Sequence, residues 1–295
     1  MASDTTTAIL TVEGLRKSFE HHRGKGTGRP TAVDGVGFSL RAGQTLAIVG
    51  ESGAGKSTTG RMILRLIEPD AGTIHFDGVD IRSLRAHELR RMRARMQMIF
   101  QDPYSSLNPK VTVGAAVAEP LRFHTDLSRR ERAEEALRLL ERVGIRPDQI
   151  DRFPYEMSGG QLQRIAIARA LATKPYLVVC DEPTASLDVS IQAQVINLLL
   201  ELQAERGMSY LFISHNLSLV RTFADHIAVM RNGQIVEAKP ADELFDNPTH
   251  PYTRQLLSAV PVPDPHVPGL LAPDGTHEET HMQATGSVAA RDRDR

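Results

Sequence analysis

The eight residues from Gly50 to Ser57, GESGAGKS, constrain the fold of this chain more than any other stretch. They fit the pattern G-x-x-x-x-G-K-[ST] of a phosphate-binding loop, whose glycines let successive backbone N–H groups point at one anion. An apolar run, 46–49, precedes the loop, and apolar residues at helical spacing, from Met62 to Ile67, follow it. A strand, a loop and a helix therefore meet here, as the motif requires. This context favours a nucleotide site over an ordinary glycine-rich turn.

The residue types in this loop predict binding of ATP together with Mg²⁺. Lys56 would reach the β- and γ-phosphates, and the hydroxyl of Ser57 would bind the metal ion. The positive end of the following helix dipole would add to the attraction for phosphate. The residues of this segment that we expect to contact the nucleotide are Gly50, Ser52, Gly53, Ala54, Gly55, Lys56, Ser57 and Thr58.

Composition and charge narrow the class of protein. The chain has 295 residues, of which 41% are hydrophobic, so a sizeable core is available. A net charge of −1 gives no global attraction to nucleic acid or anionic membranes. No apolar run reaches the length of a membrane span, and Met1 to Thr7 lack the features of a secretory signal, so a cytosolic chain is expected. The single cysteine, Cys180, excludes an internal disulfide and a multi-cysteine metal site, and we interpret it as a small buried hydrophobe.

The run from Arg82 to Arg95 is the densest basic stretch of the chain. A nucleic-acid surface is one interpretation, but no aromatic residues are interleaved to stack on bases, so a solvated helix is favoured. The adjacent histidines His21 and His22 lie in a basic loop, 21–30, and neither they nor the C-terminal histidines have the spacing of metal ligands. The stretch 261–295 is rich in proline, glycine and charge, and we expect a disordered tail there.

Three further apolar runs end in polar residues that phosphate transfer requires. Gln101 follows the first run, Asp181 and Glu182 follow the second, and His215 follows the third. Because ligands bind at the carboxyl ends of strands in an open parallel sheet, these residues should converge with the phosphate loop. Asp181 would then hold Mg²⁺, and Glu182 would polarise the water that attacks the γ-phosphate. Gln101 and His215 would surround that phosphate. The alternative, a pair of carboxylates at a surface turn, is disfavoured by the hydrophobic strand before them.

Other segments predict where helices and turns begin. Ser158–Gln161, SGGQ, is similar to a capping box, and its glycine-rich helix start is open to an anion. Ser128–Glu131 is a second capping box, and Asp188 can cap a helix that Gly207 stops. The turn 231–234 lies between two apolar runs and predicts a β-hairpin.

Taken in chain order, these motifs resemble those of the nucleotide-binding subunit of an ABC transporter. The motifs are residues 50–57, Gln101, Ser158–Gln161, Asp181–Glu182, Ser186–Asp188 and His215. SGGQ followed by Leu162-Gln163-Arg164 is the most specific of them, because other phosphate-loop NTPases lack it. The stretches 101–109 and 247–253 further resemble the ATPase subunits of oligopeptide and dipeptide importers.

The resemblance implies an α/β fold. Its core would be that of a P-loop NTPase with a mainly parallel sheet, accompanied by an N-terminal antiparallel β subdomain and an inserted α-helical subdomain. The ABC ATPase domain would run from 8 to 260, with the helical subdomain at about 102–164 and an importer-type C-terminal extension at about 240–260.

The resemblance also implies a dimer, formed with a second copy of the chain or with a related ABC ATPase. ATP would lie between the phosphate loop of one subunit and the signature segment of the other. The signature residues that would act in trans are Ser158, Gly159, Gly160 and Gln161. Phe19 stands where the family places its adenine-stacking aromatic residue, and Asp188 would couple the two sites. Gln101 would join Ser57 and Asp181 as a Mg²⁺ ligand.

The implied partners are two integral membrane permease subunits, contacted by the region from Gln101 to about residue 157, and indirectly a solute-binding protein. The chain would then work at the cytoplasmic face of the cell membrane, and no nucleic acid partner is expected. The predicted function is an ATPase that powers import of peptides or similar small solutes.

Two alternatives belong to other classes of protein. An ABC-type ATPase acting on nucleic acid or ribosomes is disfavoured, since such relatives usually hold two cassettes or a long coiled coil and this chain has neither. A scaffold that binds ATP without hydrolysing it is disfavoured by Glu182. The chain departs from the family pattern at Met157, where leucine is usual, and it cannot form the C-terminal cysteine cluster of some relatives. Neither departure affects the predicted hydrolysis.

Overall fold

The computed structural model of the chain describes residues 8–19, 31–185 and 187–258. The loop 21–30, Ser186 and the tail 261–295, each considered above, lie outside the described residues. Within the described ranges the strands are β1 (Ala8–Ser18), β2 (Thr31–Arg41), β3 (Thr45–Val49), β4 (Ala71–Phe76), β5 (Val79–Asp80), β6 (Met96–Ile99), β7 (Leu177–Asp181), β8 (Ser209–Ser214), β9 (His226–Arg231) and β10 (Gln234–Pro240).

Helices connect and cover these strands. They are α1 (Lys56–Ile63), α2 (Ala86–Arg95), α3 (Pro103–Ser106), α4 (Val113–His124), α5 (Arg129–Arg142), α6 (Gly159–Leu171), α7 (Val189–Arg206), α8 (Leu217–Arg221), α9 (Ala241–Asp246) and α10 (Pro251–Ser258), with 3-10 turns at Ile81–Ser83, Pro147–Gln149 and Pro154–Glu156. Among the described residues, every helix is too short or too polar to cross a membrane.

The strands form two sheets. The larger sheet has the order β10-β9-β3-β8-β7-β6, and all of its neighbouring pairs are parallel except β10 with β9. The smaller sheet has the order β2-β1-β4-β5 and its paired strands run antiparallel. This arrangement confirms the expected fold class, a mainly parallel core sheet with an N-terminal antiparallel sheet.

The central strands of the larger sheet are apolar because both of their faces are covered. Every residue of β3 and β8 is buried. Along β3, Ala47 and Val49 pack in one apolar cluster with residues of α4 to α7, whereas Leu46 and Ile48 pack in a second cluster with α1 and the smaller sheet. A continuous apolar run is therefore what a strand at this position needs.

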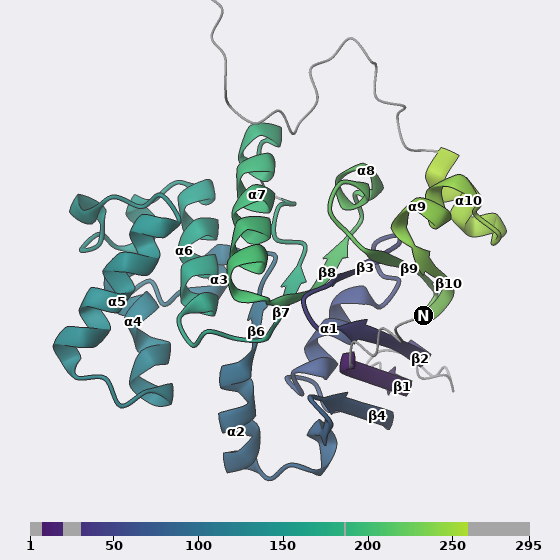
Figure 1. The fold of residues 1–295 in the computed structure, drawn as a ribbon, viewed down its shortest axis with the longest axis horizontal. Coiled ribbons are helices and arrows are strands. Elements are labelled where there is room, and N and C mark those ends of the chain that lie inside the picture. The colour runs from purple at the N-terminus through teal and green to yellow at the C-terminus, as the bar shows by residue number, and fades with distance from the viewer. Residues whose placement is uncertain (1–7, 20–30, 186, 259–295) are drawn as a thin grey trace, which may run out of the picture. The chain divides into compact units, whose positions relative to one another are not determined.

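The helices between β6 and β7 pack on one another. Helices α4, α5 and α6 gather beside the β6 edge of the larger sheet, whereas α9 and α10 lie by β10 at its other edge (Figure 1). The predicted capping box begins α5: Ser128 Oγ accepts a hydrogen bond from Glu131 N at 3.3 Å, and Glu131 Oε2 accepts one from Ser128 N at 2.7 Å. The predicted hairpin turn, 231–234, joins β9 to β10.

Two stretches differ in detail from the structure that their local residue pattern suggests. The alternating run 73–78 is typical of an edge strand, but β4 pairs on one side with β1 and on the other with β5, so β5 forms the edge. The loop after Gln101 contains the one-turn helix α3, because Asp102 Oδ1 accepts a hydrogen bond from Tyr104 N and Pro103 occupies the first helical position.

Candidate active site

The register of the larger sheet brings the carboxyl ends of its strands to one edge. Val49 of β3 lies opposite Ser214 of β8, and Asp181 of β7 lies opposite Ile213. Gly50, Glu182 and His215 directly follow the ends of β3, β7 and β8, and Gln101 comes just after Phe100 at the end of β6. The convergence predicted from the sequence is therefore produced by strand pairing.

The phosphate loop is folded tightly against neighbouring backbone. A Cβ atom on Gly50 would lie 2.1 Å from Met230 O, and one on Gly55 would lie 2.2 Å from Ala32 O. Gly55 also has φ +102°, a conformation that favours glycine. Gly55 is the N-cap of α1, and no side chain caps this helix start. Its first N–H groups are therefore left for another acceptor, which is what phosphate binding requires.

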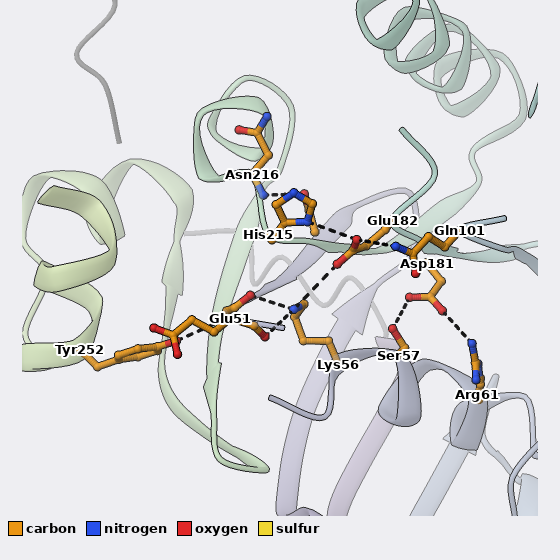
Figure 2. A network of polar contacts seen from close by, with 12 residues as sticks. Glu51, Lys56, Ser57, Arg61, Gln101, Asp181, Glu182, His215, Asn216 and Tyr252 are labelled. Atoms are coloured by element: carbon orange, nitrogen blue, oxygen red, sulfur yellow. Dashed lines mark hydrogen bonds and ion pairs between the residues drawn. The ribbon is translucent and has the colours of Figure 1, made fainter. Parts of the chain in front are cut away.

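Lys56 lies inside the loop, with 4% of its side chain exposed. Its Nζ atom donates hydrogen bonds to Gly50 O at 2.8 Å and to Glu51 O at 2.9 Å, and lies 4.0 Å from Glu182 Oε1. Burial lowers the pKa of Lys56, and the nearby carboxylates of Glu182 and Asp181 oppose part of that effect. The ammonium group is thus held between the loop carbonyls and the carboxylate (Figure 2).

Asp181 is fully buried and joins the loop to β7. Its Oδ1 atom accepts a hydrogen bond from Ser57 Oγ at 2.6 Å, and its Oδ2 atom lies 3.7 Å from Arg61 Nη2. Oδ2 is buried and has no hydrogen-bond partner among the described residues. Burial raises the pKa of Asp181, while the Ser57 hydrogen bond and the Arg61 charge lower it in part. A buried carboxylate oxygen with spare acceptor capacity beside a hydroxyl is a donor set that suits Mg²⁺.

Glu182 forms the centre of a second set of contacts. Its Oε2 atom accepts a hydrogen bond from Gln101 Nε2 at 3.1 Å and lies 3.2 Å from His215 Nδ1. Figure 2 shows these side chains, from the ends of three strands, directed toward one another beside Lys56. Glu182 has φ +46°, a backbone strain of roughly 1–3 kcal/mol for a residue with a Cβ, and its N–H is held by Ile213 O at 3.0 Å. Strain of this kind is typical of functional sites.

The remaining predicted site residues lie outside this network. Phe19 follows β1, and 41% of it is exposed. Ser158, Gly159, Gly160 and Gln161 begin α6, where Ser158 is exposed. Asp188 is exposed at the N-cap of α7, without a side-chain hydrogen bond to the helix. The departure at Met157 is buried, as leucine would be.

Two residues of the network were missed in the sequence. Arg61 stands four positions after Ser57, on the same face of α1, so helical spacing could have identified it. Tyr252 belongs to α10, and its hydroxyl accepts a hydrogen bond from Glu51 N at 3.2 Å. No local pattern links positions 201 residues apart.

Comparison with known proteins agrees with this geometry. The family described as "ABC transporter" matches residues 33–185, and the family "Oligopeptide/dipeptide transporter, C-terminal region" matches residues 236–287. The probable peptide ABC transporter ATP-binding protein y4tS of Sinorhizobium fredii is 52% identical over 261 residues, which cover 88% of this chain and 74% of that protein. The oligopeptide transport ATP-binding protein OppF of Bacillus subtilis is 49% identical over 262 residues, which cover 88% of this chain and 85% of that protein.

The solved structures agree as well. A dimeric, post-hydrolysis structure of the ATP-binding cassette MJ0796 with ADP and Pi has a TM-score of 0.72 and 28% sequence identity, and the match covers 79% of this chain and 98% of that one. The resemblance inferred from the motifs is therefore confirmed. From the family match, the level of identity and the shared fold, the chain belongs to the ABC transporter family, among its ATP-binding proteins.

Proposed function

We propose that this chain is the ATP-hydrolysing subunit that powers import of peptides, or of similar small solutes, through separate membrane permease subunits. The observation that carries the ATPase assignment is that Lys56 lies beside the carboxylates of Asp181 and Glu182 at the start of α1, which no side chain caps. The peptide assignment is supported by the C-terminal match at 236–287 and by relatives whose names describe peptide transport.

In this proposal one group of residues binds the phosphates of ATP and another transfers the proton of the attacking water. The backbone N–H groups at the start of α1 and the Lys56 ammonium group hold the phosphates of ATP. Glu182 Oε2 takes a proton from the attacking water, and the nearby Gln101 and His215 side chains orient that carboxylate. Proton transfer by a positioned carboxylate contributes on the order of 10²–10⁴ in rate.

The Mg²⁺ ligands proposed here are Ser57 and Asp181, with Gln101 as a further ligand. The unpartnered Oδ2 atom of Asp181 and the adjacent Ser57 hydroxyl support this choice. When bound, the ion would neutralise charge that develops on the phosphate oxygens.

The second half of the proposed site comes from a partner subunit. Ser158, Gly159, Gly160 and Gln161 would face the nucleotide of that partner, and Asp188 would couple the two sites across the dimer. Phe19 would stack on adenine, for which its exposed ring is suited. The dimeric form of a cassette with a similar fold supports a dimer, made with a copy of this chain or a related ATPase.

In the proposed assembly, two permease subunits hold the chain at the cytoplasmic face of the membrane. A solute-binding protein would deliver the solute to these permease subunits. The proposed domain limits are 8–260 for the ATPase domain, with about 102–164 as its helical subdomain and about 240–260 as its C-terminal extension. The alternative of an ABC-type ATPase acting on nucleic acid or ribosomes finds no support in the names of these relatives.

Co-purification tests the assignment. A tagged Glu182→Gln variant is extracted from membranes in Mg-ATP, because slow turnover should hold the closed complex together, and the bound proteins are identified. Two multi-span proteins, with or without a second ATPase, are the expected result. Recovery of ribosomes or nucleic acid without a membrane protein would contradict the proposal. The untagged chain serves as the control for nonspecific recovery.

A further inference from the structure

Tyr252 reaches the phosphate loop from the far end of the chain. It is 2% exposed, and its hydroxyl accepts the hydrogen bond from Glu51 N described above. The Arg231 guanidinium group lies over its ring, 4.5 Å from the centroid, which adds a cation–π contact. The phenol is therefore held on its face by Arg231 and at its hydroxyl by the loop. Figure 2 shows the contact between Tyr252 and Glu51.

The backbone of Glu51 links Tyr252 to Lys56 through two hydrogen bonds. Its N–H donates to Tyr252, and its carbonyl accepts the hydrogen bond from Lys56 Nζ at 2.9 Å. The Tyr252 contact lies before the segment 53–57, whose N–H groups are expected to face the phosphates. A displacement of Glu51 would disturb the Lys56 ammonium group, because Lys56 Nζ donates a hydrogen bond to the Glu51 carbonyl.

The β9–β10 hairpin contacts the same loop at a second place. Gly233 N donates a hydrogen bond to Ala54 O at 3.0 Å, and Met230 O lies in the space that a Cβ on Gly50 would need. The stretch 230–252 therefore contacts the loop on both sides of its centre.

A buried carboxylate fixes the start of α10 on this hairpin. Glu237 is 7% exposed; its Oε1 atom accepts hydrogen bonds from Thr249 N at 2.8 Å and Thr249 Oγ1 at 2.7 Å, and its Oε2 atom accepts one from His250 N at 2.9 Å. Burial by itself would raise the pKa of Glu237, but the surrounding polar groups of Thr253, Thr249 and His250 outweigh burial and hold the pKa at about 2. The carboxylate is therefore ionised at neutral pH and ties α10 to β10 beside the loop.

We propose that the stretch from Glu237 to Tyr252 braces the phosphate loop, and that Tyr252 is a positioning residue for nucleotide binding that acts through Glu51 and Lys56. The proposal rests on the proposed ATPase function. It gives the C-terminal extension a part in the same chain's nucleotide site, in addition to any part in transport.

The test compares two tyrosine hydroxyls. Tyr252→Phe removes the contact with Glu51. Tyr210→Phe removes another buried hydroxyl, which lies away from the loop and donates a hydrogen bond to Leu199 O at 2.8 Å. We expect Tyr252→Phe to raise the Kd for Mg-AMP-PNP by about fivefold, as the loss of one hydrogen bond implies. We expect KM for ATP to rise by a similar factor while kcat stays within about twofold. Tyr210→Phe should change thermal stability and leave the Kd unchanged.

Hydrogen exchange at Glu51 supplies a reading that does not depend on nucleotide. In the nucleotide-free full chain, the peptide that contains the Glu51 amide should exchange faster in Tyr252→Phe than in the wild type or in Tyr210→Phe. Unchanged exchange at Glu51, or an equal loss of affinity in both variants, would overturn the brace. A wild-type chain that binds no Mg-AMP-PNP would instead overturn the proposed function, and the exchange at Glu51 would still decide whether Tyr252 holds the loop.

Discussion

Helices α1 and α6 both begin in glycine-rich segments, but side chains cap the first backbone N–H groups of α6 and not those of α1. At α6, Ser158 Oγ accepts a hydrogen bond from Gln161 N at 3.3 Å, and Gln161 Oε1 accepts one from Ser158 N at 3.0 Å. At α1, the N-cap is Gly55 and no side chain caps the helix. The α6 start therefore stabilises itself, whereas the α1 start depends on groups brought from elsewhere in the fold.

The surroundings of the two helix starts differ accordingly. Around α1 the same chain supplies a buried lysine, the carboxylates of Asp181 and Glu182 at the end of β7, and the contacts of Tyr252 and Gly233. The α6 start leaves Ser158 exposed. The α1 start is thus supported by distant groups of the same chain, whereas the α6 start is capped by its own residues. We propose that this exposed α6 start faces the nucleotide of a partner subunit.

The largest expected effect lies at the assembled site. We expect Glu182→Gln to lower kcat for ATP hydrolysis by about 10²–10³, because the general base is lost, with the Kd for ATP within about twofold of the wild type. Phosphate release and nucleotide titration measure the two quantities. Glu205→Gln, on the exposed face of α7, is the control and should turn over normally. Normal turnover in Glu182→Gln would remove this residue from the role of base.

The second prediction tests the self-capped helix start. We expect Ser158→Arg to lower kcat by about a hundredfold, because the side chain would block the partner's nucleotide, while the isolated chain binds ATP as before. Ser128→Arg is the matched control, since Ser128 also begins a capping box, at α5, and should lose stability only. Specific activity should also rise with protein concentration. A strictly linear dependence of total activity, or equal loss of turnover in both variants, would contradict a shared site.

The third prediction concerns the external support of the α1 site. Because the pKa of Glu237 is depressed from 4.5 to about 2, its ionisation stabilises the fold above about pH 4.5, and this contribution is lost as pH falls toward 2. We expect Glu237→Gln to lower the free energy of unfolding by about 2 kcal/mol at pH 7, or Tm by about 4–8 °C. Urea unfolding at pH 7, 4 and 3 measures the difference between variant and wild type, which should shrink as pH falls. A difference that stays constant would contradict the assignment.

The smallest expected effect on stability has the opposite sign. Since burial raises the pKa of Asp181, its ionised form opposes folding at neutral pH, and wild-type stability should gain as pH falls through that raised pKa. We expect Asp181→Asn to raise Tm of the nucleotide-free chain by about 2–4 °C, for a gain of about 1 kcal/mol, while abolishing Mg²⁺-dependent turnover. Calorimetry at pH 7 checks this result. Asp102→Asn, which keeps the cap of α3, should leave Tm unchanged; a lower Tm for Asp181→Asn would show that the charge stabilises the fold.

Much of the fold follows from local patterns. The apolar runs that became β3, β7 and β8, the capping boxes at Ser128 and Ser158, and the turn 231–234 were all predicted, because each depends on residues within a few positions. The convergence of Gln101, Glu182 and His215 was also predictable, since parallel strands align their carboxyl ends. The roles assigned to Phe19, Asp188 and the signature segment stay predictions.

The sequence by itself determined several of the elements and the glycine-rich pattern of the loop 50–57, since hydrophobic period, caps and glycine positions act over short distances along the chain. The tertiary structure alone decided which distant groups hold that loop. The positive φ of Glu182, the approach of Arg61 to Asp181 and the contact between Tyr252 and Glu51 arise from how packed elements meet. Such contacts leave no periodic signal, because the geometry of the whole core, and not the neighbouring residues, selects each partner.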